Sequence, residues 1–418
     1  LMPVNQISMQ LALDSQWTVL GQYKLEWKET ELNPVGEHFS VSDVVGPGAE
    51  FIYGIDNPLF LENLSDVNIL SDDVPEAVEL ITRLLDLPTN PLTTPILEGL
   101  GGLLAQIDAG APNLLLPPEL LSALQPLLAG APKYINVQRG RDLKPSDHGQ
   151  WGLGLKYQLT PVTNIGLYRL RYHNTTPAPV QNYGFALLAP SPLPGVPDIT
   201  TEQLGLQVPV TYNIRYFDGI DLSALSFSTS LFGANIGGEV IYRDGIDVLV
   251  DVDGGLLGPV PTPTRGKVWQ GLLSGLYVVG PALFWDSLTI VGETGYIHVA
   301  DQEAACGPTS CSEKLTYTRD ASGYAFLFLI DRKNVVSGWD LNIPVYYSGI
   351  IDGHSSFLSG LGSLMGEKDR RASIGVNLTW LQKLQVGVSV NWFLGNPHFS
   401  ERPYADRDYA AFTAKYNF

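Results

Sequence analysis

The chain has 418 residues and a formal net charge of −18. Its 43 acidic residues against 25 Lys and Arg residues argue against nucleic-acid binding, because a phosphate-binding surface needs clustered positive charge. It contains no run of about 18 apolar residues that could cross a bilayer as a helix. A chain of this length can form two or three soluble domains or one large β-barrel, and the composition excludes neither.

The first clear pattern is an alternation of apolar and polar residues. It runs through 6–13 and, more regularly, through 17–28, where Trp17 and Trp27 end the apolar face while Lys24 and Glu26 lie on the other face. Alternation with a period of two predicts a strand with one apolar and one polar face. Aromatic residues at both ends of the apolar face are typical of outer-membrane strands, in which Trp and Tyr lie at the headgroup level. A soluble sandwich could show the same alternation, so the later segments must decide.

The long connection 29–147 contains three Leu-rich segments. Prolines in the first turns and apolar residues at helical spacing predict short helices over 74–87, 94–108 and 117–129. Their apolar stripes need a cover, which leaves two interpretations. Either the helices pack on one another and cap the barrel, or they also form a hydrophobic capture site. The candidate substrate-binding residues are Leu100, Leu103, Leu104, Ile107, Leu120 and Leu124.

The alternation recurs through the rest of the chain, at 151–159, 168–173, 235–243, 339–348, 373–380 and 386–392. Charged residues inside these strands are expected on the face away from lipid, because a charge in hydrocarbon is costly. Ion pairing that rigidifies the wall is an equally open interpretation of these charges. The predicted lumen-lining residues are Lys24, Glu26, Lys156, Arg169, Arg171 and Glu239.

The lengths of the connections give a second line of argument. Short turns at 14–16, 160–163, 231–234, 280–285, 333–337 and 381–384 alternate with long connections at 29–147, 174–220, 244–265, 300–317, 350–368 and 396–406. This pattern is typical of the periplasmic and extracellular ends of an outer-membrane barrel. The alternating end of the chain, closed by the aromatic Phe418, resembles the last strand of such a barrel and would end in the periplasm. Counting back from it gives about thirteen strands, so we expect at least one strand to precede Leu1.

Two of the long connections carry candidate sites. Cys306 and Cys311, in the stretch CGPTSC, predict a structural disulfide in an oxidising compartment, with a metal or redox pair as the alternative. Calcium could bind to four acidic residues expected in one loop, namely Asp244, Asp247, Asp251 and Asp253. The twelve-residue calcium signature is incomplete there, so a solvated acidic loop is the favoured interpretation and no cofactor is expected.

Several stretches carry a family resemblance: LMPVNQ (1–6), QYKLEW (22–27), KPSDHGQWGL (144–153), LYRLRYH (167–173), SFSTS (226–230) and ADRDY (405–409). Nearly the whole chain resembles the DUF1302 family of Gram-negative outer-membrane proteins. The resemblance implies that a Gly- and Arg-rich strand region precedes Leu1. It also implies traffic in hydrophobic molecules, because genes of this family are commonly linked with lipid-handling proteins and inner-membrane exporters. The family offers no established catalytic residues to carry over.

These observations together predict an all-β fold, a transmembrane antiparallel β-barrel of the bacterial outer membrane that forms one domain over 1–418. The expected function is a channel or transporter for uptake or export of hydrophobic small molecules or lipids. A passive polar porin and a structural or secretion partner are the alternatives. The expected partners are outer-membrane lipids and lipopolysaccharide, a periplasmic lipid-handling protein and an inner-membrane exporter. The six His residues occur singly and in no recognisable nucleophile or metal motif, so an enzyme is not expected.

Overall fold

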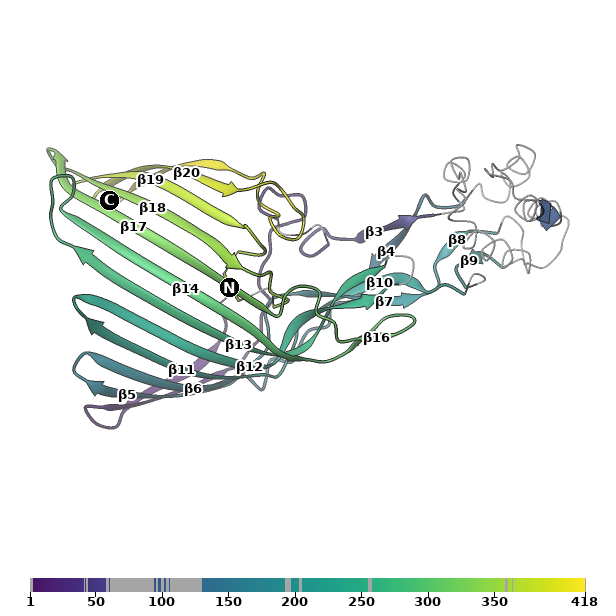
Figure 1. Ribbon diagram of the computed structural model, residues 1–418, viewed down its shortest axis with the longest axis horizontal. Coiled ribbons are helices and arrows are strands. Elements are labelled where there is room, and N and C mark those ends of the chain that lie inside the picture. Colours follow the sequence, from purple (N-terminus) through teal and green to yellow (C-terminus); the bar gives the residue numbers. More distant parts are fainter. Residues whose placement is uncertain are drawn as a thin grey trace.

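A computed structural model of the chain shows a large curved sheet at one end and a narrower arm at the other (Figure 1). The structure describes residues 3–40, 42, 44–57, 60, 94, 97, 98, 101, 102, 105, 130–191, 197–202, 205–254, 258–357, 360–362 and 364–417. Within this part of the chain, no helix is both long enough and apolar enough to cross a membrane. The architecture of the described elements is all-β, as the alternating sequence predicts.

The large sheet has thirteen strands in the order β1-β2-β5-β6-β11-β12-β13-β14-β17-β18-β19-β20-β21, and all neighbours are antiparallel. This number agrees with the count from the sequence. The strands are β1 Gln6–Ala12, β2 Trp17–Lys24, β5 Trp151–Thr160, β6 Thr163–Tyr172, β11 Ile220–Leu231, β12 Ala234–Asp253, β13 Pro259–Val279, β14 Ser287–Gln302, β17 Asp320–Val336, β18 Trp339–Asp352, β19 Arg370–Trp380, β20 Leu384–Leu394 and β21 Tyr409–Tyr416.

Tight turns join the strands at the broad end of the sheet. Phe232 and Gly233 connect β11 to β12 with φ angles of 51° and 79°. Two successive residues with positive φ are typical of a type I′ turn, whose twist matches that of the flanking strands. This turn sets the register in which Leu231 pairs with Ala234, and it confirms the predicted short connection at 231–234.

The predicted long loop at 244–265 is wrong, because β12, which is 20 residues long, continues through it to Asp253, and β13, which is 21 residues long, begins within it at Pro259. Val248, Val250 and Val252 alternate with polar residues and are almost fully buried, so the segment has a strand's pattern with a core-facing side. A register shift beside Gly245, whose φ is 84°, marks a bulge where the hairpin leaves the broad sheet.

The arm also contains strands that the sequence analysis assigned to loops. Its four-stranded sheet has the order β3-β4-β10-β7, with β3 Phe51–Asp56, β4 Tyr134–Arg139, β7 Ala178–Gly184 and β10 Val208–Arg215. Val137, Tyr212 and Ile214 form its buried core together with Val45 and Tyr216. Two small hairpins complete the set, β8 Leu187–Ala189 with β9 Ile199–Thr200, and β15 Ala305–Cys306 with β16 Cys311–Ser312.

The two edges of the large sheet are β1 and β21, and the described residues show no pairing between them. Closure into a barrel by strand pairing is therefore not seen. The segment that follows β2 nevertheless reaches the last strand. Arg407 donates from Nη1 to the carbonyl oxygens of His38 and Ser40 at 2.8 and 2.7 Å, and the Phe39 ring lies 5.2 Å from that of Tyr409. The sheet thus curls far enough for its two ends to meet through this segment.

The Leu-rich helical insertion falls almost entirely outside the described residues. The ranges 74–87 and 117–129 lie outside the described residues, and so does most of the apolar stripe of 94–108. Within 94–108 the described residues Thr94, Leu97, Glu98, Gly101, Gly102 and Ala105 have helical backbone. The insertion as a Leu-rich helical unit therefore remains a prediction.

Candidate functional site

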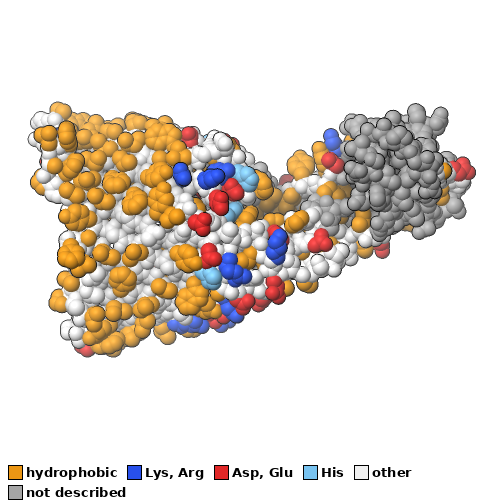
Figure 2. Space-filling view, in the orientation of Figure 1, with side chains coloured by type: hydrophobic (Ala, Val, Ile, Leu, Met, Phe, Trp, Pro, Cys, Tyr) orange, Lys and Arg blue, Asp and Glu red, His pale blue; other side chains and the backbone are white. Residues whose placement is uncertain are grey.

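The large sheet has one face that is apolar and strongly exposed, here called the apolar face. Leu167, Leu225 and Val240 lie side by side on it in register and are 54%, 48% and 49% exposed. Val388 and Phe412 continue it on the last two strands. Figure 2 shows apolar side chains spread over the broad end of the molecule. Water-soluble monomers rarely expose apolar surface on this scale, whereas lipid contact requires it.

The opposite face, here called the polar face, carries three of the six predicted lumen residues. Lys24 lies on β2, and Lys156 and Glu239 lie in one register row with Gly166 and Ser226 between them. Two strands lie between β5 and β12, so the backbones of Lys156 and Glu239 are about 14 Å apart. Because Gly166 and Ser226 are small, no large side chain of this row covers the polar face between the two charged residues.

Glu26 lies beyond the end of β2 rather than in the wall. Its carboxylate is 3.3 Å from Nζ of Lys28 and accepts the backbone N–H of Asn5. The predicted lumen position of Glu26 is therefore not supported by its contacts, which tie together the two chain segments next to β1 and β2.

The lumen assignment of Arg169 and Arg171 is wrong. Arg169 pairs with Leu153 and Ser223, and this register places it on the apolar face. Both arginines lie in the last four residues of β6, next to the arm, and both contact Asp221, at 3.4 and 3.7 Å. The alternation was ambiguous here, because large apolar residues occupy both faces of β6.

The consequence of this register is a concave site on the polar face, here called the inner hollow. It has a volume of about 460 Å³, and its polar-face lining consists of Ser8, Gln10, Leu20, Gln22, Tyr168 and Leu170 around Gly152 and Gly154. A Cβ atom on Gly154 would lie 2.9 Å from the Tyr168 ring, so glycine allows the ring to lie flat against the wall. Apolar side chains next to amides and hydroxyls suit an amphipathic or apolar ligand.

The described part of the connection 353–369, here called the inner loop, folds onto the polar face of β12, β13 and β14. Phe357 is only 4% exposed and packs with Val268, Ile297 and Val299. Gln270 donates from Nε2 to the carbonyl oxygen of Gly360 at 2.6 Å, in a buried hydrogen bond. The inner loop therefore covers part of the polar face of these three strands.

His354 anchors the start of the inner loop. Its ring stacks on Tyr317 with centroids 3.6 Å apart, and among the described residues Nε2 has no hydrogen-bond partner. Burial lowers the pKa of His354 below its ordinary value, and the neighbouring Glu401 opposes this shift. At the other end of the loop, Arg402 donates to the carbonyl oxygen of Glu367 at 2.6 Å. The inner loop is thus fixed by a ring stack at its start and by a hydrogen bond near its end.

The model of the family described as "Protein of unknown function (DUF1302)" matches residues 1–418. The chain belongs to the DUF1302 family. Among solved structures, the outer membrane channel DcaP of Acinetobacter baumannii is similar over 99% of this chain and 84% of that chain, at 9% identity and a TM-score of 0.35. No curated protein matches the sequence.

The four aspartates of the possible calcium site in this DUF1302 chain do not come together. They are spread along β12, where Asp247 accepts a hydrogen bond from Asn174 and Asp251 lies 3.4 Å from Lys314. The described residues hold no group of three or more His, Cys, Asp or Glu side chains that could bind a metal ion. The six candidate substrate-binding residues between Leu100 and Leu124 lie outside the described residues.

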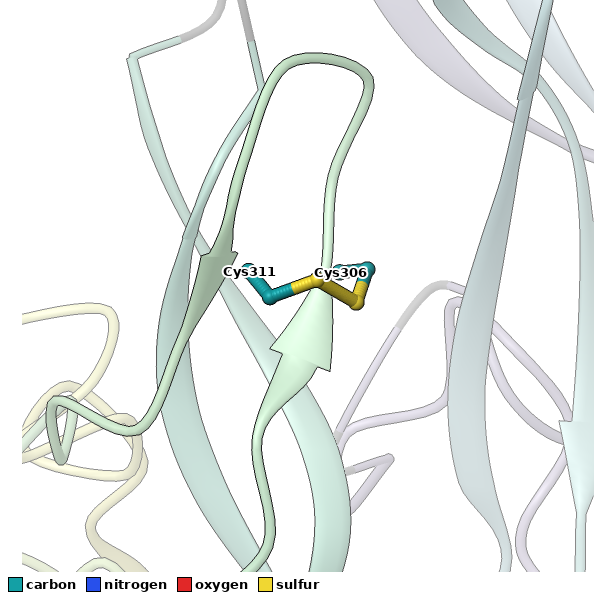
Figure 3. The surroundings of a disulfide bond; sticks show 2 residues. All are labelled: Cys306 and Cys311. Atoms are coloured by element: carbon teal, nitrogen blue, oxygen red, sulfur yellow. A yellow bond between two sulfur atoms is a disulfide. The ribbon is translucent and has the colours of Figure 1, made fainter.

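Cys306 and Cys311 form the predicted disulfide (Figure 3). They are register partners in the β15–β16 hairpin, with Cα atoms 3.9 Å apart. Thr309, at the tip of this hairpin, donates to the carboxylate of Asp253 on β12. The disulfide therefore closes the small hairpin, and the Thr309 hydrogen bond ties this hairpin to β12.

A cleft of about 730 Å³, which no sequence pattern indicated, lies between the broad sheet and the arm. Trp27 and Tyr216 meet edge to face in its lining, with ring centroids 4.9 Å apart. Lys144 pairs with Glu29 at 2.5 Å, and burial raises the pKa of Tyr216 well above its ordinary value. Its residues come from segments more than 100 positions apart, so no local pattern could have indicated it.

Proposed function

We propose that this DUF1302 protein is an outer-membrane β-barrel channel that passes hydrophobic small molecules or lipids along its interior. The observation that carries the proposal is the inner hollow, a concave site on the polar face in which apolar side chains lie next to amides and hydroxyls. In the membrane, the apolar face contacts lipid, the curved sheet closes, and the polar face lines the lumen. The strand ends next to the arm then lie on the extracellular side.

A mainly apolar row on the polar face supports a hydrophobic substrate. Leu20, Tyr168 and Ala224 occupy one register row of the inner wall. Ile241 and Ile297 continue it toward Phe357 of the inner loop, with the polar Gln270 between them. A pore for polar solutes alone has no need of such a row. The predicted capture site at Leu100 and Leu104 belongs to the same proposal, as the first contact of the substrate outside the membrane.

A passive polar porin is the second candidate, and the other half of the wall favours it. Asn377 donates to Oδ1 of Asn342 at 3.3 Å, and Asn342 donates to Oδ1 of Asp331 at 3.0 Å, which makes a polar ladder across β17, β18 and β19. Water and small ions suit such a wall. The two candidates therefore differ in which half of the lumen a solute uses.

The test places carboxylates in the inner hollow. Leu20→Glu with Leu170→Glu should abolish uptake of a labelled long-chain alcohol by cells, because the apolar contacts are replaced by charges. Ser389→Glu with Asn391→Glu adds the same charge to the polar face of β20 and should leave uptake nearly unchanged. All forms are compared at equal surface level and equal heat resistance. Normal uptake by the hollow variant would reject the hydrophobic route, and equal loss in both variants would favour the polar porin.

A further inference from the structure

A groove of about 790 Å³ runs over the apolar face, here called the outer groove. Its walls come from β5, β6, β11, β12 and β13 and include Leu153, Leu155, Leu167, Leu225 and Val240. Tyr242 and Trp269 close one side, with ring centroids 4.8 Å apart. Aromatic residues of this kind are enriched at the level of lipid headgroups.

Arg169 and Arg171 lie at the arm end of the outer groove. Their side chains are 47% and 48% exposed, and they share a single carboxylate, that of Asp221 on the β11 side. On the β5 side their register partners are Leu153 and Trp151, which carry no charge. Two guanidinium groups beside one carboxylate leave an excess of positive charge on the apolar face, at this end of the groove.

The rest of the charged belt has no excess of positive charge, because its two cations are paired and Asp244 adds a third carboxylate. Lys267 pairs with Asp301 at 2.8 Å, and Arg265 pairs with Asp218 at 2.6 Å. Asp244 lies in register between Asp221 and Lys267. Figure 2 shows charged residues of both signs gathered where the apolar surface ends. The excess of positive charge is therefore local to the two arginines at the end of the groove.

We propose that the outer groove binds a lipid with a phosphorylated sugar headgroup, the lipid A portion of the outer leaflet. This inference rests on the proposed location in the outer membrane. Guanidinium groups bind phosphate through paired N–H donors, and Ser223, which already accepts from Arg169 at 2.7 Å, holds that side chain toward the groove. One acyl chain lies along Leu167 and Leu225, about 7 Å below Arg169. Tyr242 and Trp269 contact the sugar at the headgroup level.

Native mass spectrometry of the purified full chain tests the proposal, with diphosphoryl lipid A and phosphatidylglycerol as probes. Arg169→Ser with Arg171→Ser should weaken lipid A binding by at least about tenfold, since charge-assisted hydrogen bonds are lost. Leu225→Trp keeps the surface apolar but fills the groove, and it should weaken binding similarly. Lys314→Ser with Lys333→Ser removes two exposed cations elsewhere and should change nothing.

Equal lipid A binding by wild type and the arginine variant would overturn the inference. So would phosphatidylglycerol binding as tight as that of lipid A, because the sugar phosphates would then contribute nothing. Conductance of the same preparations in planar bilayers separates this inference from the channel proposal. Arginine-dependent lipid A binding without conductance would leave the lipid site standing and remove the channel. Conductance without arginine-dependent lipid A binding would leave the channel proposal standing and reject the lipid site.

Discussion

Replacing Phe357 by Ala should release the inner loop from the wall. Phe357 is buried against Ile297 and Val299, and truncating a buried Phe to Ala costs about 3–5 kcal/mol. Each 1.4 kcal/mol is a factor of ten in an equilibrium, so the ratio of open to packed loop should rise by at least about 100-fold. The buried bond from Gln270 to the carbonyl oxygen of Gly360 would be exposed to water in the same step.

Single-channel recording in planar bilayers is the assay. If the packed loop narrows the lumen, Phe357→Ala should show larger mean conductance and more frequent transitions between levels than wild type. Amide hydrogen exchange of Leu249, Thr318 and Ser356 gives an independent readout. Leu249 and Thr318 donate backbone hydrogen bonds to carbonyl oxygens of the inner loop, Ser356 donates to the carbonyl oxygen of Thr318, and all three bonds should open more often.

Phe399→Ala is the matched control. Phe399 lies in the neighbouring connection and is 89% exposed, so its loss should alter neither conductance nor exchange. Faster exchange in Phe357→Ala with unchanged conductance would refute the idea that the packed inner loop narrows the lumen, since the loop would then move without affecting ion flow. Unchanged exchange would show that Phe357 does not hold the loop at all.

Three further outcomes follow from the described contacts. Acidification through the ordinary titration range of histidine should loosen the inner loop and raise conductance, because the packed His354 binds a proton less readily than the released one; His354→Gln should remove this dependence. Cys306→Ser with Cys311→Ser should speed amide exchange in the β15–β16 hairpin and leave the melting temperature of the large sheet nearly unchanged, as calorimetry can check, because the closed loop is short. Gly154→Val should reduce uptake of a long-chain alcohol while ionic conductance persists, because its side chain would displace Tyr168 from the wall of the inner hollow.

Period-two alternation made the large sheet predictable. Each of its strands needs only a local pattern, and each short turn joins neighbours in sequence, so the strand number and the antiparallel order follow from reading the chain in order. The same reasoning gave the positions of Lys156 and Glu239 on the polar face, because their strands have clearly different faces.

The arm could not be predicted in this way. Its sheet pairs β4 in parallel with β10, and it places Thr211 opposite Gln138, which is 73 positions earlier. No short-range pattern records a pairing over that distance. The cleft beside Trp27 and Tyr216 is hidden for the same reason, since it exists only after the arm has formed.

Strand β6 explains why the expectation that charged residues lie on the face away from lipid failed for the two arginines. It also explains why this error bears on function. Ile165 and Leu167 on one face, and Tyr168 and Leu170 on the other, make the alternation uninformative, so only pairing with β5 and β11 decides the faces. A charge on the lipid side is costly at the centre of a bilayer and far less so near its edge, which is where the proposed membrane position puts these arginines. With the arginines on the apolar face, Tyr168 and Leu170 must lie on the polar face. The register that would place positive charge against the headgroups in the proposed position is therefore the same register that lines the inner hollow.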